Sequence, residues 1–304
     1  MAPVSGVGLD IGATKTLGVR TDSEGRVLDR VRVPTEPGPD GVVRTAVEVV
    51  RRLGLSTGDG WSLGVGVPGL VDVDRGAVKH AVNLGLDGDW FPLRDRLADR
   101  LGLTVLVEND VNAAAMGATA LLPASVPHDL AYLSLGTGLA AGLVLDGRLR
   151  RGIHGAAGEI GHLPVDPAGA ECPCGQRGCL ETVASGSALA AAWNGTPDVP
   201  AASAVLAAAA DGDPRAVAVR NRFADGVAAA IRLLCLTVDV EAVVLGGGVA
   251  QVGEPLRAAV AEALERQAAG SGFLRSLALA ERLRVVPADH PVAAVGAALL
   301  GRRP

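Results

Sequence analysis

The chain has 304 residues, of which 49% are hydrophobic and only 2% aromatic, and its formal net charge is −5. Its length suggests about two domains with cores of Val, Leu, Ala and Ile. The acidic balance argues against non-specific binding to nucleic acid or to an anionic membrane surface. The N-terminus lacks the pattern of a signal peptide or anchor, and no apolar run reaches membrane-spanning length. We therefore expect a cytoplasmic protein with reduced thiols and no membrane partner.

The first 110 residues show strand and helix periodicity in alternation. Residues 4–34 alternate apolar and polar positions around tight glycine turns, which predicts three strands. Helical spacing follows over 41–54 and 92–102, and buried strands are expected over 62–68 and 104–110. This order predicts an α/β lobe.

The same hairpin pattern begins again at residue 129. Residues 129–152 align with residues 6–30 so that Gly12 falls on Gly136. Such a repeat is typical of a duplicated lobe, and two facing lobes would place both glycine turns at one cleft. Chance similarity between glycine-rich hairpins is the alternative.

Most of the chain after residue 185 is predicted to be helical, with the longest helix over 214–238. A strand over 241–250 runs into a triple-glycine turn, another strand follows over 282–288, and a closing helix is expected over 290–303. The predicted lobes are 1–110 plus 289–304, and 111–288.

Three glycine-rich turns, at 9–16, 135–142 and 245–250, each directly follow an apolar strand. Turns of this kind present backbone N–H groups to phosphates, and Asp10 at the end of the first strand can hold a hydrated Mg²⁺. For one turn alone, a purely conformational role is the alternative. We expect the turns to belong to the strand framework.

Asn109 and Asp110 lie between a strand and a helix predicted over 111–122. Asp110 is a candidate N-cap of that helix. It is also a candidate base, which would accept the proton of a substrate hydroxyl as that oxygen attacks a γ-phosphate. The two roles are compatible.

Three of the four cysteines, Cys172, Cys174 and Cys179, fall within eight residues, and His162 precedes them. Together they supply the four ligands of a closed, structural Zn²⁺ site, with free or redox-active thiols as the alternative. Cys235 lies apart, in an apolar helix, and is expected to be a buried hydrophobe.

Glu159 and Glu181 flank the cysteine segment, so an ordered metal loop would fix both acids. Rigid carboxylates suit a polyol, because a fixed orientation lowers the entropy cost of binding. Solvent-exposed acids on a loop are the alternative.

These motifs resemble those of the ROK (repressor, open reading frame, kinase) sugar kinases, most closely the bacterial glucokinase-like members. The resemblance spans nearly the whole chain and rests on LDIGATKT, GVGVPGLVD, ENDVNAAAMGA, LGTGLAAG, GAAGEIGH and CPCGQRGCLE. It implies an α/β, actin-like (ribonuclease-H-like) duplicated ATPase fold with two lobes around a cleft. It also implies ATP and Mg²⁺ as cosubstrates, a hexose acceptor, glucose foremost, and a homodimer or homotetramer.

The resemblance also assigns residue roles, with Asp110 as the catalytic base. The implied hexose contacts are Gly69, Asn83, Asn109, Asp110, Glu159, His162 and Glu181. The implied ATP and Mg²⁺ contacts are Asp10, Gly12, Thr14, Lys15, Gly136, Thr137, Gly138, Gly246, Gly247 and Gly248. The implied zinc ligands are His162, Cys172, Cys174 and Cys179, with the second nitrogen of His162 directed to the sugar.

Three features depart from the family pattern. Ala140 and Ala141 stand where the second turn has glycines, the loop over 82–93 is longer, and Ala118 replaces a glutamate. N-acetylglucosamine, N-acetylmannosamine, mannose or fructose therefore stay open as acceptors, as do another phosphoryl donor and a non-catalytic sugar sensor. A DNA-binding repressor is not expected, because the first strand begins near Met1 and the chain is acidic.

Overall fold

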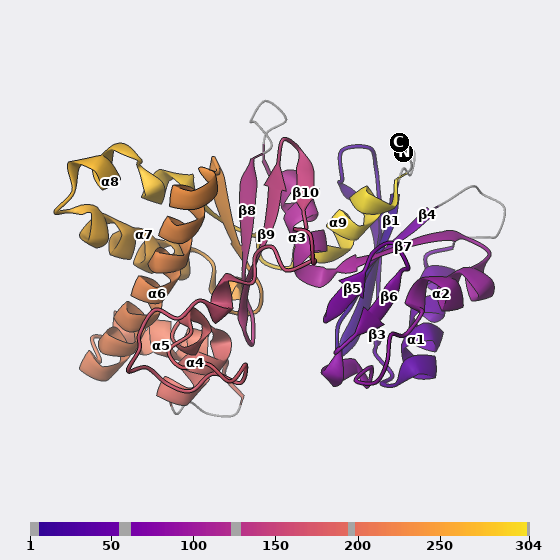
Figure 1. Cartoon of the computed structure of the whole chain (residues 1–304), viewed down its shortest axis with the longest axis horizontal. Helices are drawn as coiled ribbons and strands as arrows, with labels where there is room; N and C mark the ends of the chain where they lie inside the picture. The colour runs from indigo at the N-terminus through magenta and orange to yellow at the C-terminus, as the bar shows by residue number, and fades with distance from the viewer. Residues whose placement is uncertain (1–5, 55–61, 123–128, 194–197, 303–304) are drawn as a thin grey trace. The chain divides into compact units, whose positions relative to one another are not determined.

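The computed structural model describes residues 6–54, 62–122, 129–193 and 198–302. Contacts divide the chain into two compact units. The first comprises Met1–His128, Arg148–Ala157 and Pro291–Pro304, and the second comprises Asp129–Gly147 and Gly158–His290. Each unit contains strands and helices (Figure 1), which agrees with the predicted α/β class.

The sheet of the first unit has the strand order β3-β2-β1-β4-β7. Its strands are β1 (Gly6–Ile11), β2 (Lys15–Thr21), β3 (Val27–Pro34), β4 (Ser62–Val67) and β7 (Thr104–Asn109). β1 pairs antiparallel with β2 and parallel with β4, and β4 pairs parallel with β7. A small antiparallel pair, β5 (Leu70–Asp72) and β6 (Ala77–Lys79), follows β4 in the chain.

Helices α1 (Pro39–Arg52) and α2 (Leu93–Leu101) share one hydrophobic core with the strands of this sheet. The apolar residues of α1 recur at helical spacing, so one of its faces is buried against the sheet. Helix α9 (Val292–Gly301) packs on β1 and β4. The short β10 (Arg148–Arg150) also belongs to this unit.

Helix α3 (Asp110–Thr119) lies in the first unit, whereas the predicted lobe boundary fell at residue 110. The reason is a close crossing with α9. A Cβ atom on Gly117 would lie 1.9 Å from the carbonyl oxygen of Val292, and one on Gly296 would lie 1.7 Å from that of Ala113. The two backbones therefore touch through glycines, which keeps α3 with the first sheet.

The sheet of the second unit repeats the order of the first. β9 (Leu139–Leu145) pairs antiparallel with β8 (Leu130–Leu135), which pairs parallel with β11 (Ala242–Gly246), and β12 (Leu283–Val285) pairs parallel with β11. The sequence β9-β8-β11-β12 thus corresponds to β2-β1-β4-β7. This correspondence explains the repeated hairpin of the sequence as an internal duplication.

Helices supply most of the core of the second unit. They are α4 (Gly186–Ala192), α5 (Ala201–Ala210), α6 (Pro214–Val238), α7 (Glu254–Ala268) and α8 (Gly272–Ser276). Buried residues of α6 and α7 share one cluster with β8 and β11. α6 spans the predicted range, because Asp213 caps its first turn and Asp239 ends it in the left-handed conformation. Among the described residues, no helix has the length and hydropathy needed to cross a bilayer.

Candidate functional site

The first glycine turn joins β1 to β2 and is supported by the end of β3. The Gly12 amide donates to the carbonyl of Lys15 at 3.0 Å. The Thr35 hydroxyl donates to the carbonyl of Gly12 at 2.7 Å and lies 2.9 Å from the buried hydroxyl of Thr16. Thr14 and Lys15 are exposed. The turn is therefore fixed from behind while its tip faces outward.

Asp10 lies at the end of β1, before this turn. Burial, and after it the nearby Asp110 carboxylate, raise the pKa of its carboxyl, the Lys15 ammonium opposes both effects, and the resulting pKa is about 7. Two carboxyl groups that disfavour each other's ionisation form a site that a divalent cation or a proton would stabilise.

Asn109 is the N-cap of α3. Its Oδ1 accepts hydrogen bonds from the amides of Val111 at 3.0 Å and Asn112 at 3.2 Å, and its Nδ2 donates to the carbonyl of Gly69 at 3.2 Å. Asp110 is the first residue of the helix, so the prediction that it serves as N-cap is wrong. Because Asn109 occupies the cap position, the Asp110 carboxylate is left for a separate role. Its Oδ1 accepts a hydrogen bond from the Val111 amide at 2.9 Å, which orients the side chain.

Glu108 is a buried acid that supports this turn from inside the unit. Its Oε2 accepts hydrogen bonds from Arg151 Nε at 2.7 Å and forms an ion pair with Arg151 Nη2 at 2.6 Å. Its Oε1 accepts from the Asn109 amide and from Asn112 Nδ2, both at 3.0 Å. Oε1 thus holds the start of α3, while Oε2 is neutralised by the Arg151 guanidinium.

Gly69 and Asn83 lie nearby in the chain but in different settings. Gly69 follows β4 and accepts the Asn109 bond described above, so it belongs to the same cluster. Asn83 lies in the short helix η1 (Val82–Leu84) and is exposed. The structure brings Gly69, Asn109 and Asp110 together, and within the described part of the chain no hydrogen bond joins Asn83 to them.

The second glycine turn joins β8 to β9 and has a different support. The Gly136 amide donates to the Gly138 carbonyl at 3.1 Å, and the Gly136 carbonyl accepts from the Gly186 amide at 2.8 Å. Glu181 Oε2 accepts from the Leu139 amide at 2.9 Å. The expectation that this turn belongs to the strand framework alone is wrong, because the cysteine segment supplies one of its hydrogen bonds.

The third glycine turn begins at the end of β11. Gly246 is the last residue of that strand, and a Cβ on Gly247, whose φ is 82°, would lie 2.6 Å from the Leu135 carbonyl oxygen. Since Leu135 directly precedes the second turn, the second and third turns lie at the same edge of this sheet. The structure thus brings together two of the predicted phosphate-binding segments.

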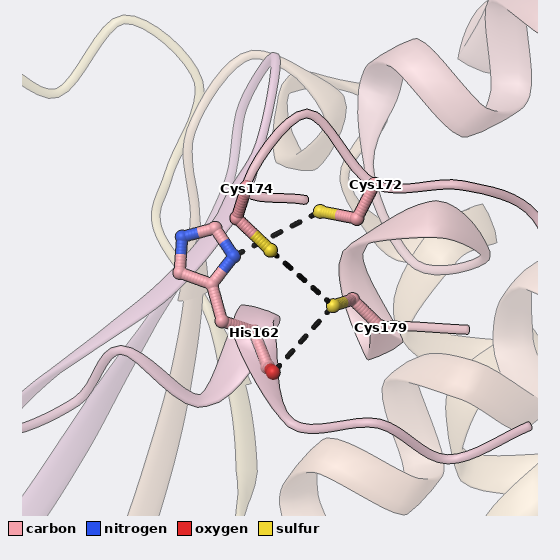
Figure 2. A group of neighbouring side chains, drawn as sticks. All are labelled: His162, Cys172, Cys174 and Cys179. Carbon is pink, nitrogen blue, oxygen red and sulfur yellow. Dashed lines mark hydrogen bonds between the residues drawn. The ribbon is translucent and has the colours of Figure 1, made fainter. Parts of the chain in front are cut away.

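The four predicted metal ligands converge. Figure 2 shows the imidazole of His162 and the thiols of Cys172, Cys174 and Cys179 pointing toward one another, and their ligand atoms all lie within 4.8 Å of one another. Cys174 Sγ is 3.7 Å from Cys179 Sγ, and Cys172 Sγ is 3.9 Å from His162 Nδ1. A disulfide requires sulfurs about 2.05 Å apart, so these cysteines are free.

The cluster fits a tetrahedral metal ion. Thiolates bonded to one zinc ion at about 2.3 Å stand about 3.8 Å apart, which matches the Cys174–Cys179 separation. Hydrogen bonds from Gln176 lower the pKa of Cys174 to about 6, whereas burial and the neighbouring thiols raise that of Cys179 to about 12. A bound cation would relieve this crowding of thiolates, so His162, Cys172, Cys174 and Cys179 can hold a metal ion.

The imidazole of His162 links this cluster to Glu159. Its Nδ1 faces Cys172, and its Nε2 lies 3.8 Å from Glu159 Oε2. Glu159 is about half exposed. The two ring nitrogens therefore point to different surroundings, and the acid lies on the side away from the thiols.

The comparisons with known proteins identify the family. The family model described as ROK family matches residues 6–303. The chain belongs to the ROK family. This confirms the resemblance seen in the motifs, and the predicted actin-like duplicated fold is that of its solved neighbours.

Two glucokinases and one N-acetylmannosamine kinase illustrate the similarity. A glucokinase of Halalkalibacterium halodurans is 34% identical over 88% of this chain and 88% of its own. A ROK family glucokinase of Streptomyces griseus, solved in complex with glucose and AMPPNP, is 33% identical, with a TM-score of 0.77 over 98% of this chain and 99% of its own. An N-acetylmannosamine kinase of Citrobacter koseri is 34% identical over 81% of this chain and 84% of its own.

Thr35, Glu108 and Arg151 were missed by the sequence analysis of this ROK protein. Glu108 lies inside a motif that was recognised, but its partner Arg151 is 43 residues away. Thr35 reaches Gly12 across 23 residues. A signal for Glu108 did exist, since an acid in an otherwise apolar strand needs a buried partner.

Proposed function

We propose that this protein is an ATP-dependent hexose kinase, a glucokinase that converts glucose to glucose 6-phosphate. The observation that carries the proposal is the pair of Asn109 and Asp110 at the start of α3. Asn109 satisfies the helix terminus, so the Asp110 carboxylate is oriented without serving as the cap. A carboxylate held in this way is suited to remove a proton from an alcohol.

In the proposed reaction the 6-hydroxyl oxygen of the hexose attacks the γ-phosphorus of ATP. The bond between that phosphorus and the β,γ-bridging oxygen breaks, ADP leaves, and Asp110 takes the hydroxyl proton. Glu108 contributes indirectly, because its bonds to the Asn109 amide and to Asn112 hold the turn that carries Asp110. Positioning and proton transfer are thus supplied by one short segment.

Hexose binding is assigned to the residues that the family resemblance implies. We propose that these are Gly69, Asn83, Asn109, Glu159, His162 and Glu181. The support is chemical: fixed carboxylate, amide and imidazole groups match a ring of hydroxyls. The relatives named glucokinase favour glucose as the acceptor.

ATP is assigned to the glycine turns. Gly12, Thr14 and Lys15 of the first turn and Gly136, Thr137 and Gly138 of the second would bind phosphates through backbone N–H groups and hydroxyls. Gly246, Gly247 and Gly248 would lie against the nucleoside. Asp10 fits Mg²⁺, because its carboxyl favours a counter-charge, and the ion would neutralise the charge that develops on the phosphates.

The cysteine cluster is proposed to hold a structural Zn²⁺. Four protein ligands leave no position for water, so the ion would hold the loop rather than take part in the reaction. The same proposal places the protein in the cytoplasm as a homodimer or homotetramer, acting in carbohydrate metabolism at the entry of glucose to glycolysis.

N-acetylmannosamine is the second candidate acceptor, because a kinase named for that sugar is as similar in identity as the glucokinase. One acetyl group shifts discrimination by only about 1–3 kcal/mol. The loop over 82–93 is longer than in the family pattern, and its residues can supply such a difference.

A coupled assay for ADP release tests the proposal, with glucose, mannose, fructose, N-acetylglucosamine and N-acetylmannosamine as acceptors. We expect the highest kcat/KM for glucose with ATP and Mg²⁺. A higher value for N-acetylmannosamine would replace glucose as the substrate. Sugar binding without turnover, with ATP and with polyphosphate alike, would show a non-catalytic sugar sensor instead.

A further inference from the structure

The two carboxylate oxygens of Glu181 lie near two different groups of the second unit. Oε2 accepts the Leu139 amide at 2.9 Å, directly after the second glycine turn. Oε1 lies on the side of the metal cluster, 4.0 Å from Cys172 Sγ. A residue that only bound sugar would have no need to hold a backbone amide of the phosphate-binding turn.

Gly138 is shaped for this contact. A Cβ atom at position 138 would lie 2.2 Å from Glu181 Oε2, so any other residue would push the carboxylate away from the Leu139 amide. The absence of a side chain at position 138 therefore leaves the space that this carboxylate occupies. Ser187 and Gly186 contact the same turn, with amides donating to the carbonyls of Thr137 at 3.3 Å and Gly136 at 2.8 Å.

The place of Glu181 is set by the metal loop. The residue follows the ligand Cys179 by two positions, in the short helix η3 (Leu180–Thr182). The fully buried Leu180 between them donates its amide to the Leu163 carbonyl at 2.9 Å, and Leu163 directly follows the ligand His162. The backbone hydrogen bond between Leu180 and Leu163, which positions Glu181, thus lies next to two of the proposed metal ligands.

We propose that Glu181 is a positioning residue for the second phosphate-binding turn, which couples the nucleotide site to the hexose and metal sites of the same unit. The inference rests on the proposed function and extends it. A carboxylate that holds the Leu139 amide fixes the direction of the neighbouring Gly136–Gly138 amides before ATP arrives. Nucleotide binding without any sugar therefore depends on Glu181.

Three variants separate this role from sugar binding. Glu181→Ala removes the acceptor of the Leu139 amide, whereas Glu181→Gln keeps an acceptor oxygen of the same reach and loses the charge. Glu159→Ala is the matched control, because Glu159 is also assigned to the hexose but is half exposed and bonded to His162 rather than to the turn. Glu181→Asp, one methylene shorter, replaces the alanine variant if that variant does not fold.

The first measurement is titration of each protein with a non-hydrolysable ATP analogue and Mg²⁺, without sugar. We expect Glu181→Ala to bind about tenfold more weakly, the change that follows from losing one charge-assisted hydrogen bond. Glu181→Gln and Glu159→Ala are expected to bind the analogue within about twofold of the natural protein. The glutamine retains a neutral hydrogen bond to the Leu139 amide, and Glu159→Ala leaves the Glu181 bond unchanged. Glucose affinity should fall in all three variants.

The second measurement is amide hydrogen exchange over residues 136–142 without ligand, which should quicken in Glu181→Ala alone. Unchanged nucleotide affinity in Glu181→Ala, or an equal loss in Glu159→Ala, would overturn the inference. ADP release by the natural protein with glucose is measured in parallel. If that turnover is missing while the analogue binds, the proposed function fails, and the titrations still decide the role of Glu181. If the natural protein binds no analogue, the proposed function and the inference about Glu181 are both overturned.

Discussion

The two repeated hairpins carry the same glycines but differ in what holds them. The first turn is closed by its own backbone and by Thr35, at the end of the neighbouring strand. The second turn is held by Glu181 and Gly186, which come from the segment that follows the cysteines. Duplication therefore preserved the strand order while the supports diverged. A perturbation of the metal loop should reach the second turn and spare the first.

The acids near the two turns differ as well. The alignment of Gly12 with Gly136 places Asp10 opposite Ser134, so only the first turn has a carboxylate at the end of its leading strand. The first unit also contributes Asp110. The proposed catalytic carboxylates thus belong to the first unit, whereas the second contributes the metal loop, and each unit can be tested by itself.

The largest effect is expected from Asp110→Asn. The amide keeps hydrogen bonding but cannot take a proton, so kcat should fall by about 10²–10⁴-fold while sugar affinity stays within about tenfold. Steady-state kinetics with glucose and a separate sugar titration measure both. Thr119→Val serves as a control, since it removes a hydroxyl at the far end of the same helix, where it bonds to the Met116 carbonyl. Near-natural kcat in Asp110→Asn would limit this residue to a structural role.

The next effect concerns the second turn alone. Cys174→Ala leaves three metal ligands, so we expect metal content to fall from about one ion per chain and nucleotide affinity to drop by about tenfold. Amide exchange should quicken over residues 136–142 and not over residues 12–16. Elemental analysis and exchange are compared with Cys235→Ala, which removes a buried thiol of α6 outside the cluster. Equal disturbance of both turns would contradict the proposed difference in support.

The individual strands and the glycine turns were predictable because they follow from local periodicity, whereas the fold was implied by the family resemblance. Alternating apolar residues predicted the hairpins, and helical spacing predicted α6 over its full length. The supports were not predictable. Thr35, Arg151 and Glu181 act on partners 23, 43 and 42 residues away, and isolated polar residues leave no periodic trace of the element they reach. The convergence of His162, Cys172, Cys174 and Cys179 was predictable because the close spacing of the three cysteines is itself a local signal.

The next prediction concerns Asp10 at the first turn, where apparent Mg²⁺ affinity should change by about tenfold per pH unit. Its folded-state pKa is raised to about 7, so below that pH the carboxyl holds a proton that Mg²⁺ must displace. Apparent Mg²⁺ affinity for the nucleotide complex should therefore rise with pH up to about 7 and then level off. Titrations at pH 6, 7 and 8 measure the slope. Asp10→Asn should bind Mg²⁺ weakly and without this pH dependence; an unchanged slope in that variant would remove Asp10 from the metal site.

The smallest expected effect is a loosening of the first turn by Thr35→Val. This change keeps the side-chain shape but removes the hydroxyl that donates to the Gly12 carbonyl, and it also takes a neighbour from the buried Thr16 hydroxyl. Loss of one such bond costs about 1 kcal/mol, which corresponds to about fivefold weaker nucleotide binding if the turn must be reordered on binding. Thr119→Val is the control, because that hydroxyl bonds only within its own helix, to the Met116 carbonyl. Amide exchange should quicken over residues 12–16 and stay unchanged over 136–142, the reverse of the Cys174→Ala pattern. If Thr35→Val instead loosened the second turn, the two hairpins would share a support and the difference drawn between them would be lost.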